Sequence, residues 1–192
     1  MYTAKAADSV SWYQPEPAES LRMIELVAQP PARVLDVGGG ASFLADRLVA
    51  RGYRTGVLDI AGEPLRLVQE RLGDAADDVE WYVTDVTRFV SPHTWDVWHD
   101  RAVFHFLTEP PDRSAYIDAL VKATRAGSSV IIATFGPDGP TSCSGLPVAR
   151  YSSREMQDVL GDGFELVEST REDHRTPGGG SQRFVYCRFL RD

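Results

Sequence analysis

The sequence has little cysteine and no long apolar run. Only Cys143 and Cys187 occur among its 192 residues, too few for a disulfide framework, and no Cys or His pair has the spacing typical of a metal site. No stretch approaches the roughly 20 apolar residues that cross a bilayer, and the first residues lack the apolar centre of a signal peptide. We therefore expect a cytoplasmic protein that needs no metal and no membrane.

Positive charge is also scarce. The 20 lysine and arginine residues face 28 acidic ones, which gives a net charge of −8. Without a basic surface to neutralise phosphates, nucleic acid is not expected as a partner. The length suits one domain. We expect it to cover residues 1–192, with a lid and a helix over 1–31 and a Rossmann-like core over 32–192.

Turn signals divide the chain into alternating strands and helices. Strands are expected at residues 33–37, 53–58, 79–84, 95–100, 129–135, 164–170 and 183–190. Helices are expected at residues 21–28, 42–51, 63–72, 112–125 and 154–160, the last capped by Ser152 or Ser153. This alternation builds a parallel sheet, and the short final connection requires an antiparallel pair. The expected fold is a single doubly wound α/β domain with a seven-stranded, mostly parallel sheet.

A glycine-rich turn follows the first expected strand. Residues 34–40 read V-L-D-V-G-G-G, so that Asp36 directly precedes the turn. This edge of an open parallel sheet binds nucleotide-like ligands. The dinucleotide fingerprint requires a third glycine where this chain has Phe43, and an acid beside the turn repels phosphate and attracts a cation. The pattern favours a cofactor that carries adenosine and a positive charge, a description that S-adenosylmethionine (SAM) fits.

Two further acids follow the next two strands. Asp59 ends the second strand, where a carboxylate can accept hydrogen bonds from both ribose hydroxyls. Asp85 ends the third, where it can accept from the adenine amine while the N–H of Val86 donates to a ring nitrogen. Each acid alone is also typical of a strand end or a helix cap. Together with Asp36, they favour the cofactor interpretation.

These motifs resemble those of class I SAM-dependent methyltransferases. The match runs through residues 34–40, 57–60, 82–86 and 95–107 and covers nearly the whole chain. The resemblance implies that SAM is the cofactor and that the following residues hold it: Asp36, Gly38, Gly39, Gly40, Asp59, Ile60, Asp85, Val86 and Asp100.

The segment that follows the fourth strand implies the catalytic residues. By the resemblance, Asp100 lies under the amino group or methyl of SAM, and Arg101 and His105 face the methyl acceptor. Two alternatives stay open. His105 is equally typical of a structural histidine, and Arg101 can form an ion pair with Asp96 or Asp100.

A narrower resemblance concerns the acceptor. Residues 98–102, W-H-D-R-A, are similar to the W-D-R-G stretch of thiopurine S-methyltransferases, with His99 and Ala102 as departures. Residues 172–176, E-D-H-R-T, are similar to segments of that family and of tellurite-resistance methyltransferases. The resemblance implies a small-molecule acceptor with a thiol, selenol or other soft nucleophile. The alternatives are a protein lysine, a small-molecule O- or N-acceptor, and SAM binding without catalysis.

Four further residues complete the expected site. Trp12 and Tyr13 precede the first helix, and the resemblance implies a lid in which their aromatic faces shield the sulfonium of SAM; packing on the sheet edge is the alternative. Cys143, in the loop after the fifth strand, is expected to line the acceptor pocket. His174 is expected in a polar turn, as a structural or an acceptor-site residue, and His99 beside the acceptor. The sequence is compatible with a monomer and with a homodimer.

Overall fold

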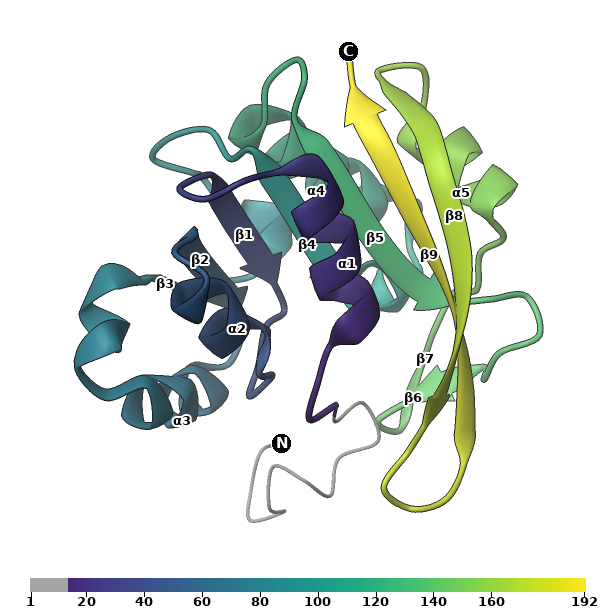
Figure 1. Cartoon of the computed structure of the whole chain (residues 1–192). Coiled ribbons are helices and arrows are strands. Elements are labelled where there is room, and N and C mark those ends of the chain that lie inside the picture. Colours follow the sequence, from purple (N-terminus) through teal and green to yellow (C-terminus); the bar gives the residue numbers. More distant parts are fainter. Residues whose placement is uncertain (1–13) are drawn as a thin grey trace.

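The computed structural model describes residues 14–192 (Figure 1), so the predictions for Trp12 and Tyr13 fall outside it. The major elements, in chain order, are α1 (Ala18–Val27), β1 (Arg33–Val37), α2 (Leu44–Ala50), β2 (Arg54–Asp59), α3 (Gly62–Leu72), β3 (Glu80–Val83), β4 (Val97–Arg101), α4 (Pro110–Ala123), β5 (Ser129–Phe135), β6 (Ser142–Cys143), β7 (Leu146–Pro147), α5 (Ser153–Leu160), β8 (Phe164–Arg175) and β9 (Ser181–Arg191). Short 3₁₀ turns include η3 (Val86–Arg88) and η4 (Phe104–Phe106).

Seven strands form one mixed sheet. Their order is β3-β2-β1-β4-β5-β9-β8, with β1 to β5 parallel and β9 antiparallel to both β5 and β8. The expected fold class is therefore confirmed. The chain leaves β1 toward β2 on one side and returns to β4 on the other, which places the topological switch point between β1 and β4. The carboxyl ends of these two strands are where such sheets bind ligands.

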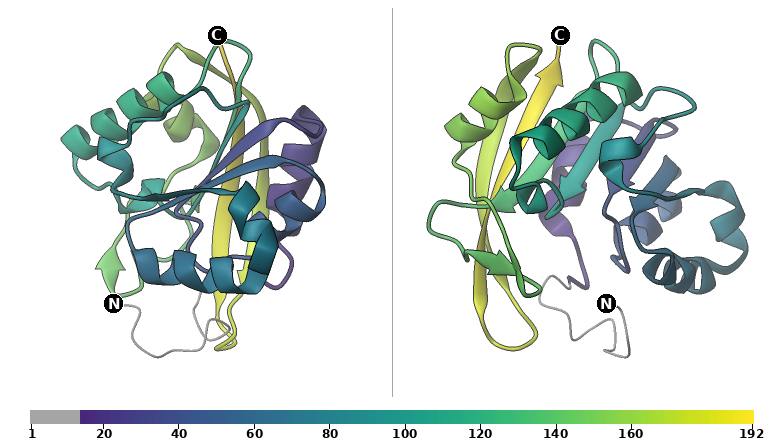
Figure 2. Two further views of the ribbon diagram at one scale, coloured as in Figure 1. Left: turned by 90° about the vertical axis from the view of Figure 1, so that its left-hand side faces the viewer. Right: turned by 180° about the vertical axis from the view of Figure 1, so that it is seen from behind.

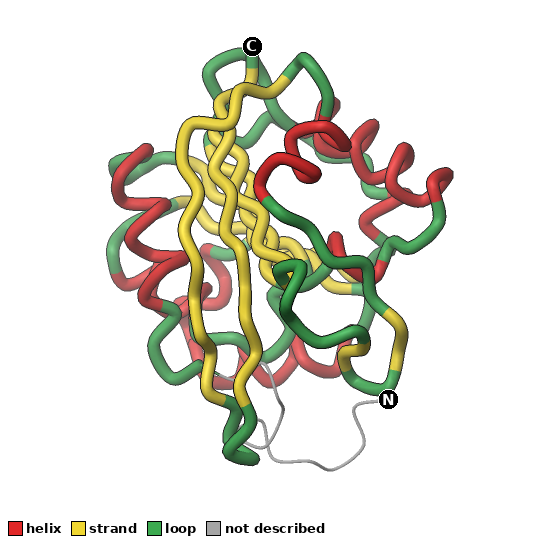
Figure 3. The backbone as a smooth tube through the Cα atoms, turned by 90° about the vertical axis from the view of Figure 1, so that its right-hand side faces the viewer, coloured by secondary structure: helices red, strands yellow, loops and turns green. Residues whose placement is uncertain are grey.

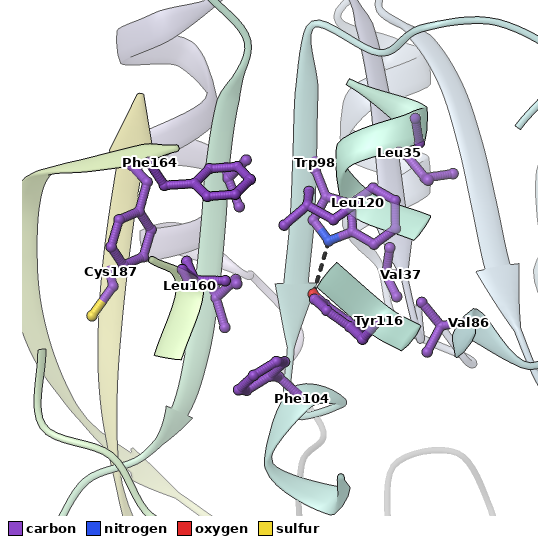
Figure 4. Close-up of a cluster of buried hydrophobic side chains, with 14 of the residues drawn as sticks. Leu35, Val37, Val86, Trp98, Phe104, Tyr116, Leu120, Leu160, Phe164 and Cys187 are labelled. Atoms are coloured by element: carbon purple, nitrogen blue, oxygen red, sulfur yellow. Dashed lines mark hydrogen bonds between the residues drawn. The ribbon is translucent and has the colours of Figure 1, made fainter. Parts of the chain in front are cut away.

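Helices cover both faces of the sheet. The helices α1 and α2 lie on one face, and α4 and α5 on the other (Figures 1 and 2). Because successive side chains of a strand point to opposite faces, Val34 packs beneath α1 while Leu35 and Val37 join the cluster under α4. In that second cluster, the indole N–H of Trp98 donates to the hydroxyl of Tyr116 at 2.8 Å (Figure 4). In residues 14–192, no helix is both long and apolar enough to cross a membrane.

The last two strands form a hairpin that is longer than expected (Figure 3). β8 runs through Arg175 and β9 begins at Ser181, which leaves residues 176–180 as the turn. His174 therefore lies in β8, opposite Gln182, and the prediction of a polar turn at this position is wrong. Alternate side chains of β8 face solvent, so a strand here is compatible with a charged sequence.

Candidate cofactor and acceptor site

The turn after β1 is closely packed, with Gly38 half-buried and Gly39 and Gly40 buried. Gly38 has φ +67°, and a Cβ at this position would lie 1.9 Å from Cγ2 of Val103. Its N–H donates to the carbonyl of Leu58 at 2.6 Å, which ties the turn to the end of β2. Only glycine combines this conformation with this lack of space. Glycine is thus required at Gly38 by the packing of the protein itself, and contact of the turn with a cofactor stays a prediction.

Asp36 lies beneath this turn with its two oxygens in different surroundings. Its Oδ1 is 2.8 Å from Nδ1 of His99, whereas its Oδ2 lies 2.8 Å from the position that a Cβ on Gly39 would occupy. The structure thus places His99 beside Asp36 and corrects its predicted place at the acceptor. The reason is the strand register, since Asp36 and His99 are direct partners across β1 and β4.

Asp59 joins the glycine turn to the end of β2. Its Oδ2 accepts the N–H of Gly40 at 3.0 Å and its Oδ1 accepts the N–H of Ala61 at 2.8 Å. Burial raises the pKa of this carboxyl, and the two N–H groups oppose the rise. Each oxygen retains a second lone pair for a further donor. Next to it, Ile60 is 73% exposed, an apolar surface that a planar base can cover.

Asp85 caps a short turn. Its Oδ1 accepts the N–H of Thr87 at 2.9 Å and the hydroxyl of Thr87 at 2.8 Å, so the capping interpretation is confirmed. The Val86 side chain is buried in the core. A role of both residues in adenine binding stays a prediction.

Asp100 is fully buried and its carboxylate faces its own loop. It accepts the hydroxyl of Tyr116 at 2.7 Å and the N–H groups of Val103 and Phe104. Burial raises the pKa of Asp100 to about 6, although these hydrogen bonds lower it. Ala102 has φ +71°, which favours glycine and accounts for the glycine in the related motif. Because the Asp100 carboxylate is engaged in this way, its contact with SAM stays a prediction.

Arg101 ends β4 within an aromatic and polar cluster. Its Nε donates to the hydroxyl of Tyr186 at 2.9 Å, and its guanidinium lies 4.4 Å over the ring of Phe184. Its Nη2 is 3.7 Å from Glu172. An ion pair therefore exists, but with neither of the two partners considered from the sequence. Tyr186 and Glu172 come from the β8–β9 hairpin, and no spacing in the sequence pairs them with Arg101.

His105 and Cys143 lie beside this cluster and are enclosed. His105 is fully buried between Phe106 and Phe135, and neither of its ring nitrogens has a hydrogen-bond partner in the described part of the chain. Burial, reinforced by Arg101, lowers its pKa to about 3. Cys143 lies in β6, is 4% exposed, and belongs to an apolar cluster in place of an open loop. Burial raises its thiol pKa.

A Rossmann-like sheet, a glycine turn after β1 and acids in β1 and at the end of β2 are compatible with the class of SAM-dependent methyltransferases. The family model described as "Methyltransferase domain" matches residues 34–127, from β1 to just beyond α4. This match covers slightly less than half of the chain and agrees with the class of SAM-dependent methyltransferases that the sequence motifs resemble.

Known proteins of this class resemble the chain at low identity. "Ubiquinone biosynthesis O-methyltransferase" of Salmonella arizonae is 25% identical over 124 residues, which are 64% of this chain and 50% of that protein. The chain thus spans about half the length of the curated relatives it matches.

Solved structures share the fold more completely. The 1,6-didemethyltoxoflavin-N1-methyltransferase of Burkholderia thailandensis, solved with S-adenosylhomocysteine bound, has a TM-score of 0.74 at 19% identity and covers 91% of this chain and 77% of its own. TehB of Haemophilus influenzae has a TM-score of 0.71 at 15% identity, covering 92% and 63%. Identities this low show the fold alone.

Proposed function

We propose that this chain transfers the methyl group of SAM to a small-molecule acceptor that bears a soft nucleophile, a thiol or a selenol. The observation that carries the proposal lies at the switch point, where the Asp59 carboxylate accepts the N–H of Gly40 in a turn made of glycines. When bound, SAM would supply a methyl group attached to a sulfonium sulfur. Once that methyl–sulfur bond breaks, S-adenosylhomocysteine is released as a neutral thioether without acid or metal assistance. The protein is left with the tasks of binding, orientation and exclusion of water.

The residues at the carboxyl ends of β1, β2 and β3 fit this cofactor. Negative charge at Asp36, below the turn, suits an ammonium group, and a phosphate would be repelled there. The free lone pairs of Asp59 suit ribose hydroxyls. The exposed side chain of Ile60 offers an apolar face to adenine, and the acid at Asp85 suits its amine.

The burial and location of the histidines support an acceptor with a soft nucleophile. His93 lies in the loop that precedes β4 and pairs with Glu80 at the start of β3, far from the carboxyl ends of the strands. His99, His105 and His174 are 2%, 0% and 6% exposed. A hydroxyl acceptor requires a general base, whereas a thiolate is already a strong nucleophile at neutral pH. A site whose neighbouring imidazoles are enclosed is better suited to sulfur or selenium.

Arg101 is the residue that we propose to act on the acceptor. Its guanidinium is held in place by the ring of Phe184 and the hydroxyl of Tyr186 at the carboxyl end of β4. A fixed positive charge next to an acceptor thiol lowers the thiol pKa and so raises its thiolate fraction. The enclosed His105 is then a wall of the site and takes no proton.

A turnover screen tests this proposal. The protein is incubated with SAM and, in parallel, with aromatic thiols, selenols, phenols and carboxylic acids, and S-adenosylhomocysteine is quantified. We expect product with thiols and selenols. Arg101→Ala should lower turnover on the order of 10²-fold, as for loss of one preorganised charge, with little change in S-adenosylhomocysteine affinity.

The matched control is Arg183→Ala, because Arg183 is a more exposed arginine that pairs with Asp138. Equal losses of turnover and affinity in Arg101→Ala would indicate a structural role. Turnover of phenols in preference to thiols would contradict the acceptor class, and no product with any acceptor would contradict small-molecule methylation.

A further inference from the structure

We propose that His99 is a positioning residue, which holds the Asp36 carboxylate in place for the ammonium group of SAM and is itself held by Ser20 of α1. This inference rests on the proposed function and deepens it, because it assigns the residue that prepares the cofactor site.

The three side chains form one buried row across two strands and a helix. Nδ1 of His99 lies 2.8 Å from Oδ1 of Asp36, and Nε2 lies 2.9 Å from Oγ of Ser20. Asp36, His99 and Ser20 are 3%, 2% and 1% exposed. Burying polar groups is costly unless each finds a partner. Here the imidazole satisfies one oxygen of the acid and the serine satisfies the imidazole.

The partners select one tautomer of the ring. A carboxylate can only accept a hydrogen bond, so Nδ1 of His99 must carry the proton that it shares with Asp36. Nε2 is then an acceptor, and the Ser20 hydroxyl donates to it. A neutral imidazole completes both contacts, which removes the need for a buried positive charge.

The held carboxylate has one oxygen left for the cofactor. Oδ1 of Asp36 is engaged by His99, whereas Oδ2 lies on the side of the turn, at the position that a Gly39 side chain would fill. Without His99, the buried carboxylate would lose a donor and the restraint on its rotation. We therefore expect His99 to act on one end of the cofactor only, the amino-acid end.

Two cofactor-like ligands separate positioning from general stability. S-adenosylhomocysteine carries the amino-acid end, and 5′-methylthioadenosine lacks it but shares the adenosine and the thioether. By calorimetry, His99→Leu should weaken S-adenosylhomocysteine binding about tenfold or more, because a hydrogen bond to a charged group is lost. Its affinity for 5′-methylthioadenosine should stay within twofold of the wild-type value.

A conservative variant and a control complete the test. His99→Asn should recover part of the affinity, since an amide N–H can donate to Asp36 from nearly the place of Nδ1. His93→Asn, a histidine variant at the opposite edge of the sheet, should change neither affinity. Nitrogen-15 shifts of the wild-type ring should show the proton on Nδ1.

The failures are distinguishable. If the wild type binds neither ligand, the proposed SAM site fails and this inference fails with it. If the wild type binds both and His99→Leu and His99→Asn lose both equally, or if S-adenosylhomocysteine affinity is unchanged, only the positioning role is overturned. A proton on Nε2 in the wild type would also overturn it, even if the leucine variant does not fold.

Discussion

Among single residues, Asp100 shows most clearly how burial changes the pKa of a side chain. Its carboxylate is fully enclosed, and one hydroxyl and two N–H groups reach it. These donors do not offset the loss of hydration, so burial raises the pKa of Asp100 to about 6. The ordinary value for aspartate is about 4. The folded protein therefore retains a proton at a pH where the unfolded chain has released it.

This difference predicts how stability changes with pH. Between about pH 4 and pH 6, the folded state binds more protons at Asp100 than the unfolded state, so its contribution to the free energy of unfolding falls as the pH rises. Asp100→Asn removes the titration and keeps an oxygen acceptor. The wild-type free energy minus that of the variant should fall across this window and stay flat above it, as measured by urea unfolding from pH 4 to pH 8.

The exposed Asp112, at the start of α4, provides the control, since Asp112→Asn should give a difference that does not change in this way. A constant difference between wild type and Asp100→Asn from pH 4 to pH 8 would show that Asp100 titrates alike in both states.

Among the elements, the turn between β1 and α2 tolerates substitution least, because it requires glycine at position 38. Gly38 and Gly73 have similar positive φ angles, +67° and +59°, but a Cβ on Gly73 would meet no atom within 4 Å. Gly73 has ψ −133° and lies outside the left-handed helical region, so Gly73→Ala should cost only the strain of this unfavourable backbone conformation, about 1–3 kcal/mol. Gly38→Ala should cost about 1–3 kcal/mol more, the usual range for overpacking, because its Cβ collides with Val103. Equal midpoints of urea unfolding for the two variants would contradict this account.

The sequence predicts elements well where the signal is local. β1 and β5 begin and end at the expected residues, because each is mostly apolar, contains β-branched residues and lies between turn residues. Ser152 caps α5 through a capping box with Glu155, as one of the two expected caps. The ends of β8 and β9 depend on pairing between distant, largely polar segments, and the β6–β7 hairpin was not expected at all. Neither the ends of β8 and β9 nor the β6–β7 hairpin has an apolar periodicity that can be read from the sequence.

In the candidate site too, features with a local sequence signal were predictable and contacts between distant segments were not. The glycine turn and Asp59 were predictable, because the carboxyl ends of parallel strands gather at one edge. His99 and Asp100 are adjacent in sequence, yet alternate residues of a strand face opposite sides of the sheet, so His99 meets α1 and Asp100 meets Tyr116 of α4. Ser20 lies in a distant helix, and no sequence pattern pairs it with His99.

At the scale of the whole molecule, the switch point joins segments from both halves of the sheet. Asp36 and Asp59 come from strands on one side of the break, and Arg101 comes from the other. The glycine turn is bonded to Leu58 and to Asp59 across neighbouring strands. We expect these linked elements to unfold together, so that the free energy of ligand binding at the switch point adds to the stability of the domain.

Ligand binding should therefore raise the melting temperature, and the choice of ligand distinguishes the two cofactor types. At about 100 times its Kd, a ligand that binds only the folded state adds about 2.7 kcal/mol, which for a domain of this size is roughly 5–10 °C. We expect S-adenosylhomocysteine to give such a shift and NADH at the same concentration to give none, because Asp36 repels a pyrophosphate and Phe43 stands where a dinucleotide site needs glycine. Asp59→Ala should reduce the shift, since the ribose loses its acceptor. A larger shift with NADH than with S-adenosylhomocysteine would mean that the acids at the strand ends serve the fold and not a cationic cofactor.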